Sequence, residues 1–184
     1  MEAERPSSDI VGLPGPTSEL PWSDSFVMQS IEILPVSLVN GEIVSLKPDC
    51  ADSFLVGWPA GAKPEVTAIA ALETLALSPK VLHSTSWRHA GNEVVLTYLA
   101  VLSPGYELPE SWEAGAVART ELARGDVTTP PPTIGVEQVL EHALRHLAWL
   151  AREDAVIGGN LPEWEGALGR YVPEPFRALG GFEP

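Results

Sequence analysis

The segment VVLTYLAVL, residues 94–102, constrains the fold more than any other part of the chain. It is apolar at odd and at even positions alike, and the side chains of a β-strand alternate between the two faces of its sheet. A strand of this composition is stable only when both of its faces are covered. The segment therefore predicts an α/β fold of the α+β type, a layered sandwich in which helices lie on both faces of a mixed β-sheet.

Turn signals and apolar periodicity divide the rest of the chain into elements. Asn40-Gly41 predicts one tight hairpin, and a second hairpin with a four-residue loop is expected around residues 89–92. Residues 105–130 are compatible with either a short strand near residues 116–118 or a helical turn. Strands are expected at residues 26–39, 42–46, 53–58, 81–88 and 93–102. Helices are expected at residues 65–77 and 136–153, and short ones from Pro162 and Pro173.

The chain is predicted to form a single globular domain over residues 25–184, with a C-terminal helical part from about residue 133. Residues 1–24 carry Glu, Ser, Pro and Gly with little apolar periodicity, which is typical of a flexible arm. A stiff polyproline connector, residues 128–133, precedes the long helix.

The order of three strands, a helix, a hairpin, a variable segment and a long helix resembles the Nudix superfamily over about residues 31–153. The signature of that superfamily holds magnesium through glutamates on one helical face, next to an Arg-Glu pair. The matching stretch here, GAKPEVTAIAALETLALSPK, contains only Glu65 and Glu73 and no Arg-Glu pair. Eight residues span about two helical turns, which is too far for these two glutamates to share one small octahedral ion. The resemblance implies a Nudix-like fold that has lost its pyrophosphatase site, so we expect no magnesium-dependent hydrolysis of nucleoside diphosphates.

Two histidines on the predicted long helix are candidate metal ligands. His142 and His146, in EHALRH, are one helical turn apart and could face one ion. The segment lacks the Glu that directly follows the first His in zinc proteases, and a third ligand would have to come from His83, His89 or an acid. We therefore interpret the pair as boundary histidines beside Trp149 and predict no metal and no cofactor.

The second hairpin supplies the candidate ligand-binding residues His83, Trp87, Arg88 and Tyr98. With a four-residue loop, Arg88 lies opposite Glu93 and His83 opposite Tyr98. In a purely structural interpretation, an Arg88–Glu93 ion pair fastens the turn and Trp87 packs in the covered face of the sheet. In a functional interpretation, His83, Trp87 and Tyr98 line a concavity for a flat or polar ligand. No catalytic residue is assigned.

The charge of the chain limits its partners. Lys and Arg number 11 against 25 Asp and Glu, and the formal net charge is -14. This balance disfavours nucleic acids and anionic membranes, which repel an acidic surface. The single cysteine, Cys50, cannot form an internal disulfide. No basic segment precedes an apolar run near the N-terminus, which favours a cytoplasmic protein.

These observations favour a non-catalytic module that binds a small molecule or a protein on a degenerate Nudix-like scaffold. The alternative is an enzyme, a hydrolase of unknown substrate, that uses His83 and nearby polar residues.

Overall fold

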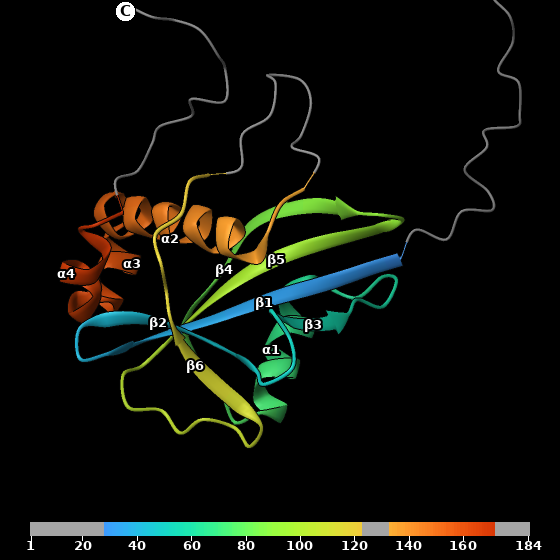
Figure 1. The fold of residues 1–184 in the computed structure, drawn as a ribbon, viewed down its shortest axis with the longest axis horizontal. Helices are drawn as coiled ribbons and strands as arrows, with labels where there is room; N and C mark the ends of the chain where they lie inside the picture. Colours follow the sequence, from blue (N-terminus) through green and yellow to red (C-terminus); the bar gives the residue numbers. More distant parts are fainter. Residues whose placement is uncertain (1–27, 123–132, 172–184) are drawn as a thin grey trace, which may run out of the picture.

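The computed structural model describes residues 28–122 and 133–171. A six-stranded mixed sheet lies between α1 on one face and α2 on the other (Figure 1). The strands are β1 (Met28–Val39), β2 (Glu42–Pro48), β3 (Phe54–Gly57), β4 (Pro79–Ala90), β5 (Glu93–Leu102) and β6 (Trp112–Ala116). The helices are α1 (Pro64–Thr74), α2 (Val136–Glu153), α3 (Ala155–Asn160), the 3-10 turn η1 (Pro162–Trp164) and α4 (Glu165–Leu168). The layered sandwich expected from the sequence is confirmed.

The strands are arranged in the order β4-β5-β1-β2-β6, and β3 also pairs with β1. β1 and β5 run parallel, and all other pairs in this sheet are antiparallel. One side of β1 is shared, because residues 30–33 pair with β3 and residues 36–39 pair with β2. Pro35 lies where the partner changes, and an interrupted ladder tolerates the missing N–H of proline. Pro35 therefore marks a change of partner in a central strand rather than an edge strand.

The apolar side chains form two cores, one on each face of the sheet. Leu99 and Val101 of β5 pack with α2, whereas Tyr98, Ala100 and Leu102 pack with α1. The prediction that β5 is covered on both faces is thus confirmed. No helix of the described part of the chain is long and apolar enough to cross a membrane.

Helix α2 has the predicted bounds, but its buried face also contains a carboxylate. Glu141 is fully buried, and its Oε1 accepts hydrogen bonds from Arg119 Nη2 at 2.9 Å and from Arg145 Nε at 2.7 Å. These two arginines replace the water that Glu141 loses on burial. Ala148 is buried as well, next to the fully buried Leu147.

The loop of the β4–β5 hairpin has two residues, Gly91 and Asn92, instead of the predicted four. Gly91 has a φ of 63°, the left-handed conformation that two-residue hairpin turns require. Arg88 consequently lies opposite Val95. The predicted pair of Arg88 with Glu93 is therefore wrong.

The register between β4 and β5 shifts at Thr85. A β-bulge of this kind leaves one residue without a partner and exchanges the faces of the residues beyond it. His83 lies opposite Leu99 instead of Tyr98, so that predicted pair is wrong too. Because of the bulge, His83 shares the face toward α2 with Arg88.

Three further elements differ from the sequence expectation in their bounds or their type. Helix α1 ends at Thr74 rather than at residue 77, and Ala76 has a φ of 55° that cannot continue a helix. The variable segment contains a strand, β6, which begins earlier than expected and pairs with β2. The helix expected at Pro162 forms as η1 and α4. The helix expected from Pro173 and the arm at residues 1–24 lie outside the described residues.

Trp87 was expected in the covered face of the sheet, but 65% of it is exposed. It lies near the hairpin end of the edge strand β4, where its ring contacts that of His89 at a centroid distance of 5.6 Å. Trp164, which the sequence places in a short terminal element, is instead fully buried in the core beside α2.

We therefore predict opposite effects for two tryptophan truncations. Trp164→Ala removes a fully buried ring and should lower the free energy of unfolding by about 3–5 kcal/mol. Trp87→Ala removes a mostly exposed ring and should change it by about 0.5 kcal/mol or less. Urea denaturation of the two variants measures both values, and an equal loss in both would contradict the burial described here.

Candidate ligand site

A carboxylate is buried at the centre of the sheet, on the face toward α2. Glu32, in the middle of β1, is 0% exposed. Its Oε1 accepts a hydrogen bond from Ser53 Oγ at 2.9 Å, and its Oε2 accepts one from Thr97 Oγ1 at 3.0 Å. Buried carboxylates stay ionised only where donors replace the lost water. The two hydroxyls, one just before β3 and one on β5, supply part of that replacement.

Arg88 of β4 supplies the rest. Its Nη1 donates to Glu32 Oε2 at 2.6 Å and its Nη2 donates to Glu32 Oε1 at 2.8 Å. Nη1 also lies 3.2 Å from Thr97 Oγ1. Burial raises the pKa of Glu32. The hydrogen bonds and charge of Arg88, together with the hydrogen bonds from the two hydroxyls, lower the pKa by more, so it lies below its ordinary value. Glu32 is therefore ionised at neutral pH and compensates the charge of Arg88 within the protein.

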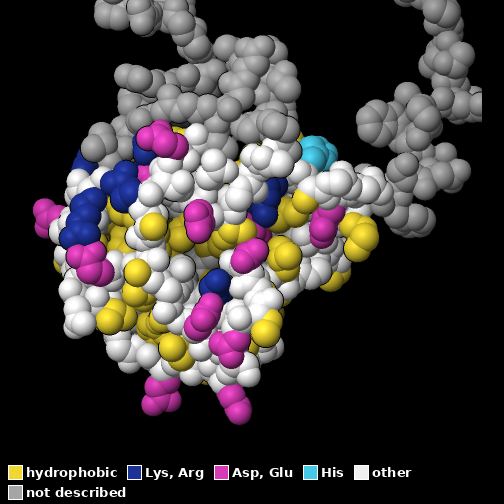
Figure 2. Space-filling model, in the orientation of Figure 1, with side chains coloured by type: hydrophobic (Ala, Val, Ile, Leu, Met, Phe, Trp, Pro, Cys, Tyr) yellow, Lys and Arg dark blue, Asp and Glu magenta, His cyan; other side chains and the backbone are white. Residues whose placement is uncertain are grey.

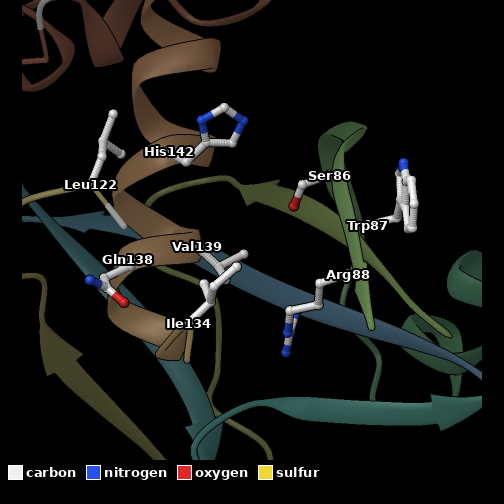
Figure 3. A pocket seen from close by; sticks show the side chains of 8 residues that line it. All are labelled: Ser86, Trp87, Arg88, Leu122, Ile134, Gln138, Val139 and His142. Atoms are coloured by element: carbon white, nitrogen blue, oxygen red, sulfur yellow. The ribbon is translucent and has the colours of Figure 1, made fainter. Parts of the chain in front are cut away.

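A hollow of about 160 Å³ lies beside this ion pair, between β4 and the first turns of α2 (Figure 3). Ser86 points from β4 toward α2, while the ring of Trp87 points away from the helix. The walls combine aliphatic side chains with a hydroxyl, an amide and an imidazole. The lining residues are Ser86, Trp87, Arg88, Leu122, Ile134, Gln138, Val139 and His142.

The start of α2 fixes one wall of the hollow. Gly135, with a φ of -78° and a ψ of 155°, is the extended residue before the helix. The side chain of Gln138 bends back, and its Oε1 accepts a hydrogen bond from the N–H of Gly135 at 3.0 Å. This contact satisfies one of the backbone donors that a helix start leaves unpaired. It also holds Gln138 at the hollow, one residue before the buried Val139.

Three histidines lie near the hollow, two on α2 and one on β4. His83 Nε2 is 3.4 Å from His146 Nδ1. His142, which lines the hollow, has its ring centroid 6.4 Å from that of His146. Burial and then the charge of His146 lower the pKa of His83, while burial and then the charge of His142 lower the pKa of His146. His83 and His146 are therefore neutral at neutral pH.

The four candidate residues from the sequence do not come together. Arg88 lines the hollow and pairs with Glu32. His83 is also on the face toward α2, but its partner is His146. Trp87 points away from α2, and Tyr98 is buried in the core beside α1, where burial and then the charge of Glu65 raise its pKa. The concavity expected between His83, Trp87 and Tyr98 is therefore not assembled.

Sequence reasoning missed Glu32, Ser86 and Gln138. Glu32 carried a usable signal, because it stands between two isoleucines in an expected strand. A charged residue at such a position needs a partner of opposite charge. Ser86 and Gln138 carried no comparable signal, since polar residues on a strand and at a helix start are common.

The residues of α1 do not fit the magnesium ion that the Nudix resemblance implies. Glu65 and Glu73 are its only carboxylates, two helical turns apart. Within residues 28–122 and 133–171, no group of three or more His, Cys, Asp or Glu side chains is arranged to hold a metal ion. Magnesium requires a near-octahedral set of oxygen ligands, which this helix does not offer.

Comparisons with known proteins identify the fold. No protein-family model matches the chain, and no curated protein matches it in sequence. A MutT/nudix family protein from Enterococcus faecalis is similar with a TM-score of 0.53 at 8% identity, over 83% of this chain and 77% of that one. Shewanella oneidensis NrtR complexed with a 27mer DNA gives 0.53 at 16% identity, over 81% and 78%. Another structure of that NrtR gives 0.52 at 15% identity, over 82% and 80%. The chain thus has a Nudix-like fold, as the order of elements implied.

Breaking the buried ion pair should destabilise the fold strongly. Arg88→Met leaves the Glu32 carboxylate buried without its cation, so the free energy of unfolding should fall by about 3–5 kcal/mol. Arg170→Met is the matched control, because Arg170 pairs with Glu42 on the exposed surface and should matter little. Urea denaturation gives both values. A loss for Arg88→Met no larger than that for Arg170→Met would contradict the role assigned to the buried pair.

The pH dependence of stability should report on Glu32. Its pKa is lower in the folded chain than its ordinary value of 4.5, so protonation favours the unfolded chain. The stabilisation is complete above about pH 4.5 and is lost as the pH falls through the folded-state pKa. The wild type should therefore lose more stability than Glu32→Gln below this pH, in about 0.5 M salt to screen surface pairs. Parallel curves for the two proteins would show that Glu32 is not the titrating group.

Proposed function

We propose that the chain is a non-catalytic module that binds a small neutral molecule in the hollow between β4 and α2. The observation that carries the non-catalytic part is the composition of α1. In the Nudix order of elements this helix holds the metal, yet here it offers two distant glutamates. Without a metal at this position, the charge that develops during diphosphate hydrolysis has no stabilising cation.

The walls of the hollow define the class of ligand. Leu122, Ile134 and Val139 favour an apolar body, whereas Ser86 and Gln138 provide hydrogen-bonding groups. At about 160 Å³ the hollow is smaller than the pockets of about 300–1,000 Å³ that hold drug-sized ligands. A heterocycle of one or two rings matches this size and mixture of groups.

Electrostatics favours a neutral ligand over a phosphorylated one. The charge of Arg88 is compensated by Glu32, so the hollow has no net cation to attract a phosphate. Acidic side chains are scattered over the viewed face of the protein (Figure 2), which adds to the repulsion of anions. One comparison structure, that of Shewanella oneidensis NrtR, contains DNA bound to NrtR. For this chain, a net charge of -14 disfavours the binding of nucleic acid.

A substitution that fills the hollow tests the proposal. Neutral one- and two-ring heterocycles are screened by thermal shift against their phosphorylated analogues, and mass spectrometry identifies any small molecule carried through purification. Binding of a neutral compound should be lost in Ser86→Phe, because Ser86 points into the hollow. Ser84→Phe is the control, since Ser84 is exposed on the same strand and lies opposite Tyr98.

The same proteins are assayed for turnover of nucleoside diphosphate derivatives with magnesium, and we expect none. Binding that survives in Ser86→Phe, or binding of phosphorylated compounds alone, would place the ligand elsewhere. Magnesium-dependent turnover that disappears in Glu73→Gln would show that the chain is an enzyme after all.

A further inference from the structure

We infer, on the basis of the function proposed above, that the hollow between β4 and α2 binds neutral ring compounds that carry a carbonyl group in preference to those that carry an amino group. Two side chains that line the hollow produce this selectivity, Arg88 and Gln138. Contacts within the fold already occupy some of the hydrogen-bonding atoms of both side chains. The atoms that are left determine which group of a ligand can pair with them.

The amide of Gln138 has its acceptor occupied by the start of α2. Its Oε1 accepts the hydrogen bond from the N–H of Gly135 at 3.0 Å. The amide nitrogen of a glutamine only donates, and that of Gln138 has no hydrogen-bond partner in the described part of the chain. A ligand beside Gln138 therefore meets a donor, and an acceptor on the ligand is the group that satisfies it.

Arg88 also offers only donors, because a guanidinium has N–H groups and no acceptor atom. Its Nη1 and Nη2 bind Glu32 and Thr97, whereas its Nε has no hydrogen-bond partner within residues 28–122 and 133–171. Glu32 compensates the charge of this guanidinium, so a phosphate or carboxylate gains little attraction here. A neutral carbonyl oxygen can accept a hydrogen bond from the remaining N–H group.

The other side chains of the walls do not reverse this preference. The hydroxyl of Ser86 can donate or accept, and the imidazole of His142 can serve either type of ligand through its two nitrogens. Leu122, Ile134 and Val139 form no hydrogen bonds through their side chains. An amino group in place of the carbonyl would face N–H groups that cannot accept from it, and an enclosed donor without a partner is costly. The lining therefore disfavours amino compounds.

Quinazolinone and aminoquinazoline, substituted at the same carbon, are matched probes, because they have the same fused rings and differ in a carbonyl or an amino group. Calorimetric titration of the full chain, under conditions in which both are uncharged, should show quinazolinone bound at least about tenfold more tightly. Gln138→Glu keeps an oxygen that accepts from Gly135, as in the usual capping box, but removes the donor. We expect the preference for quinazolinone to shrink by at least about tenfold in this variant.

Thr133→Glu is the control for the added charge, because Thr133 is exposed just before α2 and is not among the residues that line the hollow. It should keep the preference of the wild type. A further measurement needs no variant and so does not depend on how the variants fold. In NMR spectra of the wild type, quinazolinone should shift the side-chain amide signals of Gln138 and the Nε–H signal of Arg88. The amide signals of Gln29, which is exposed near the start of β1, should not change.

The outcomes separate this selectivity from the ligand site itself. Equal or tighter binding of aminoquinazoline that is lost in Ser86→Phe would refute the selectivity and leave the site in place. The same holds if quinazolinone does not bind while other neutral ring compounds do. An unchanged preference in Gln138→Glu, or unchanged signals of Gln138, would also refute the selectivity. If no neutral ring compound binds, the site and its selectivity both fail.

Discussion

The buried charge of Glu32 is the constraint on which the arrangement of the sheet depends. β1 is hydrogen-bonded on both sides, so this carboxylate cannot reach water by moving to an edge. Its cation comes from β4, which lies two strands away across β5. A shift of one residue in the pairing would turn Arg88 to the opposite face and leave Glu32 alone. The ion pair therefore discriminates between registers of the β4–β5 hairpin, whatever its net contribution to stability.

The two helical layers differ in whether charged side chains are buried beside them. The core beside α1 is built from apolar side chains, among them the buried Ala68 and Leu72 of the helix. On the side of α2, both buried carboxylates, Glu32 and Glu141, are held by arginines. Hydrogen bonds and ion pairs have stricter geometry than apolar contacts. Of these arginines, Arg119 is the one that ties α2 to another segment, because it links Glu141 to the chain that follows β6.

Local patterns predicted most of the elements, and the errors arose where backbone geometry changes the register. β5 and α2 have the expected bounds, because a long strand that is apolar on both faces and a long amphipathic helix leave strong periodic signals. The bulge at Thr85 and the short loop at Gly91 left no such signal. The shorter loop shifts the pairing by two residues and keeps the faces, whereas the bulge exchanges the faces of the β4 side chains on either side of it. The candidate residues on this hairpin were therefore assigned to the wrong faces.

Helix α1 packs on one face of the sheet, and the proposed ligand site lies on the other face, beside α2. Helix α1 follows the opening strands, as in the Nudix order of elements, yet it contacts the core through Ala68, Ala71 and Leu72 and exposes Val66 and Ile69. Such a helix needs only the right shape on its buried side, so its exposed residues can change without loss of the fold. The seam between β4 and α2 is different, because the hollow, the ion pair and the facing histidines all depend on the same register. Apolar packing alone would tolerate a change of register, but such a change would move these groups apart. The seam is therefore the part of this fold for which we propose a ligand.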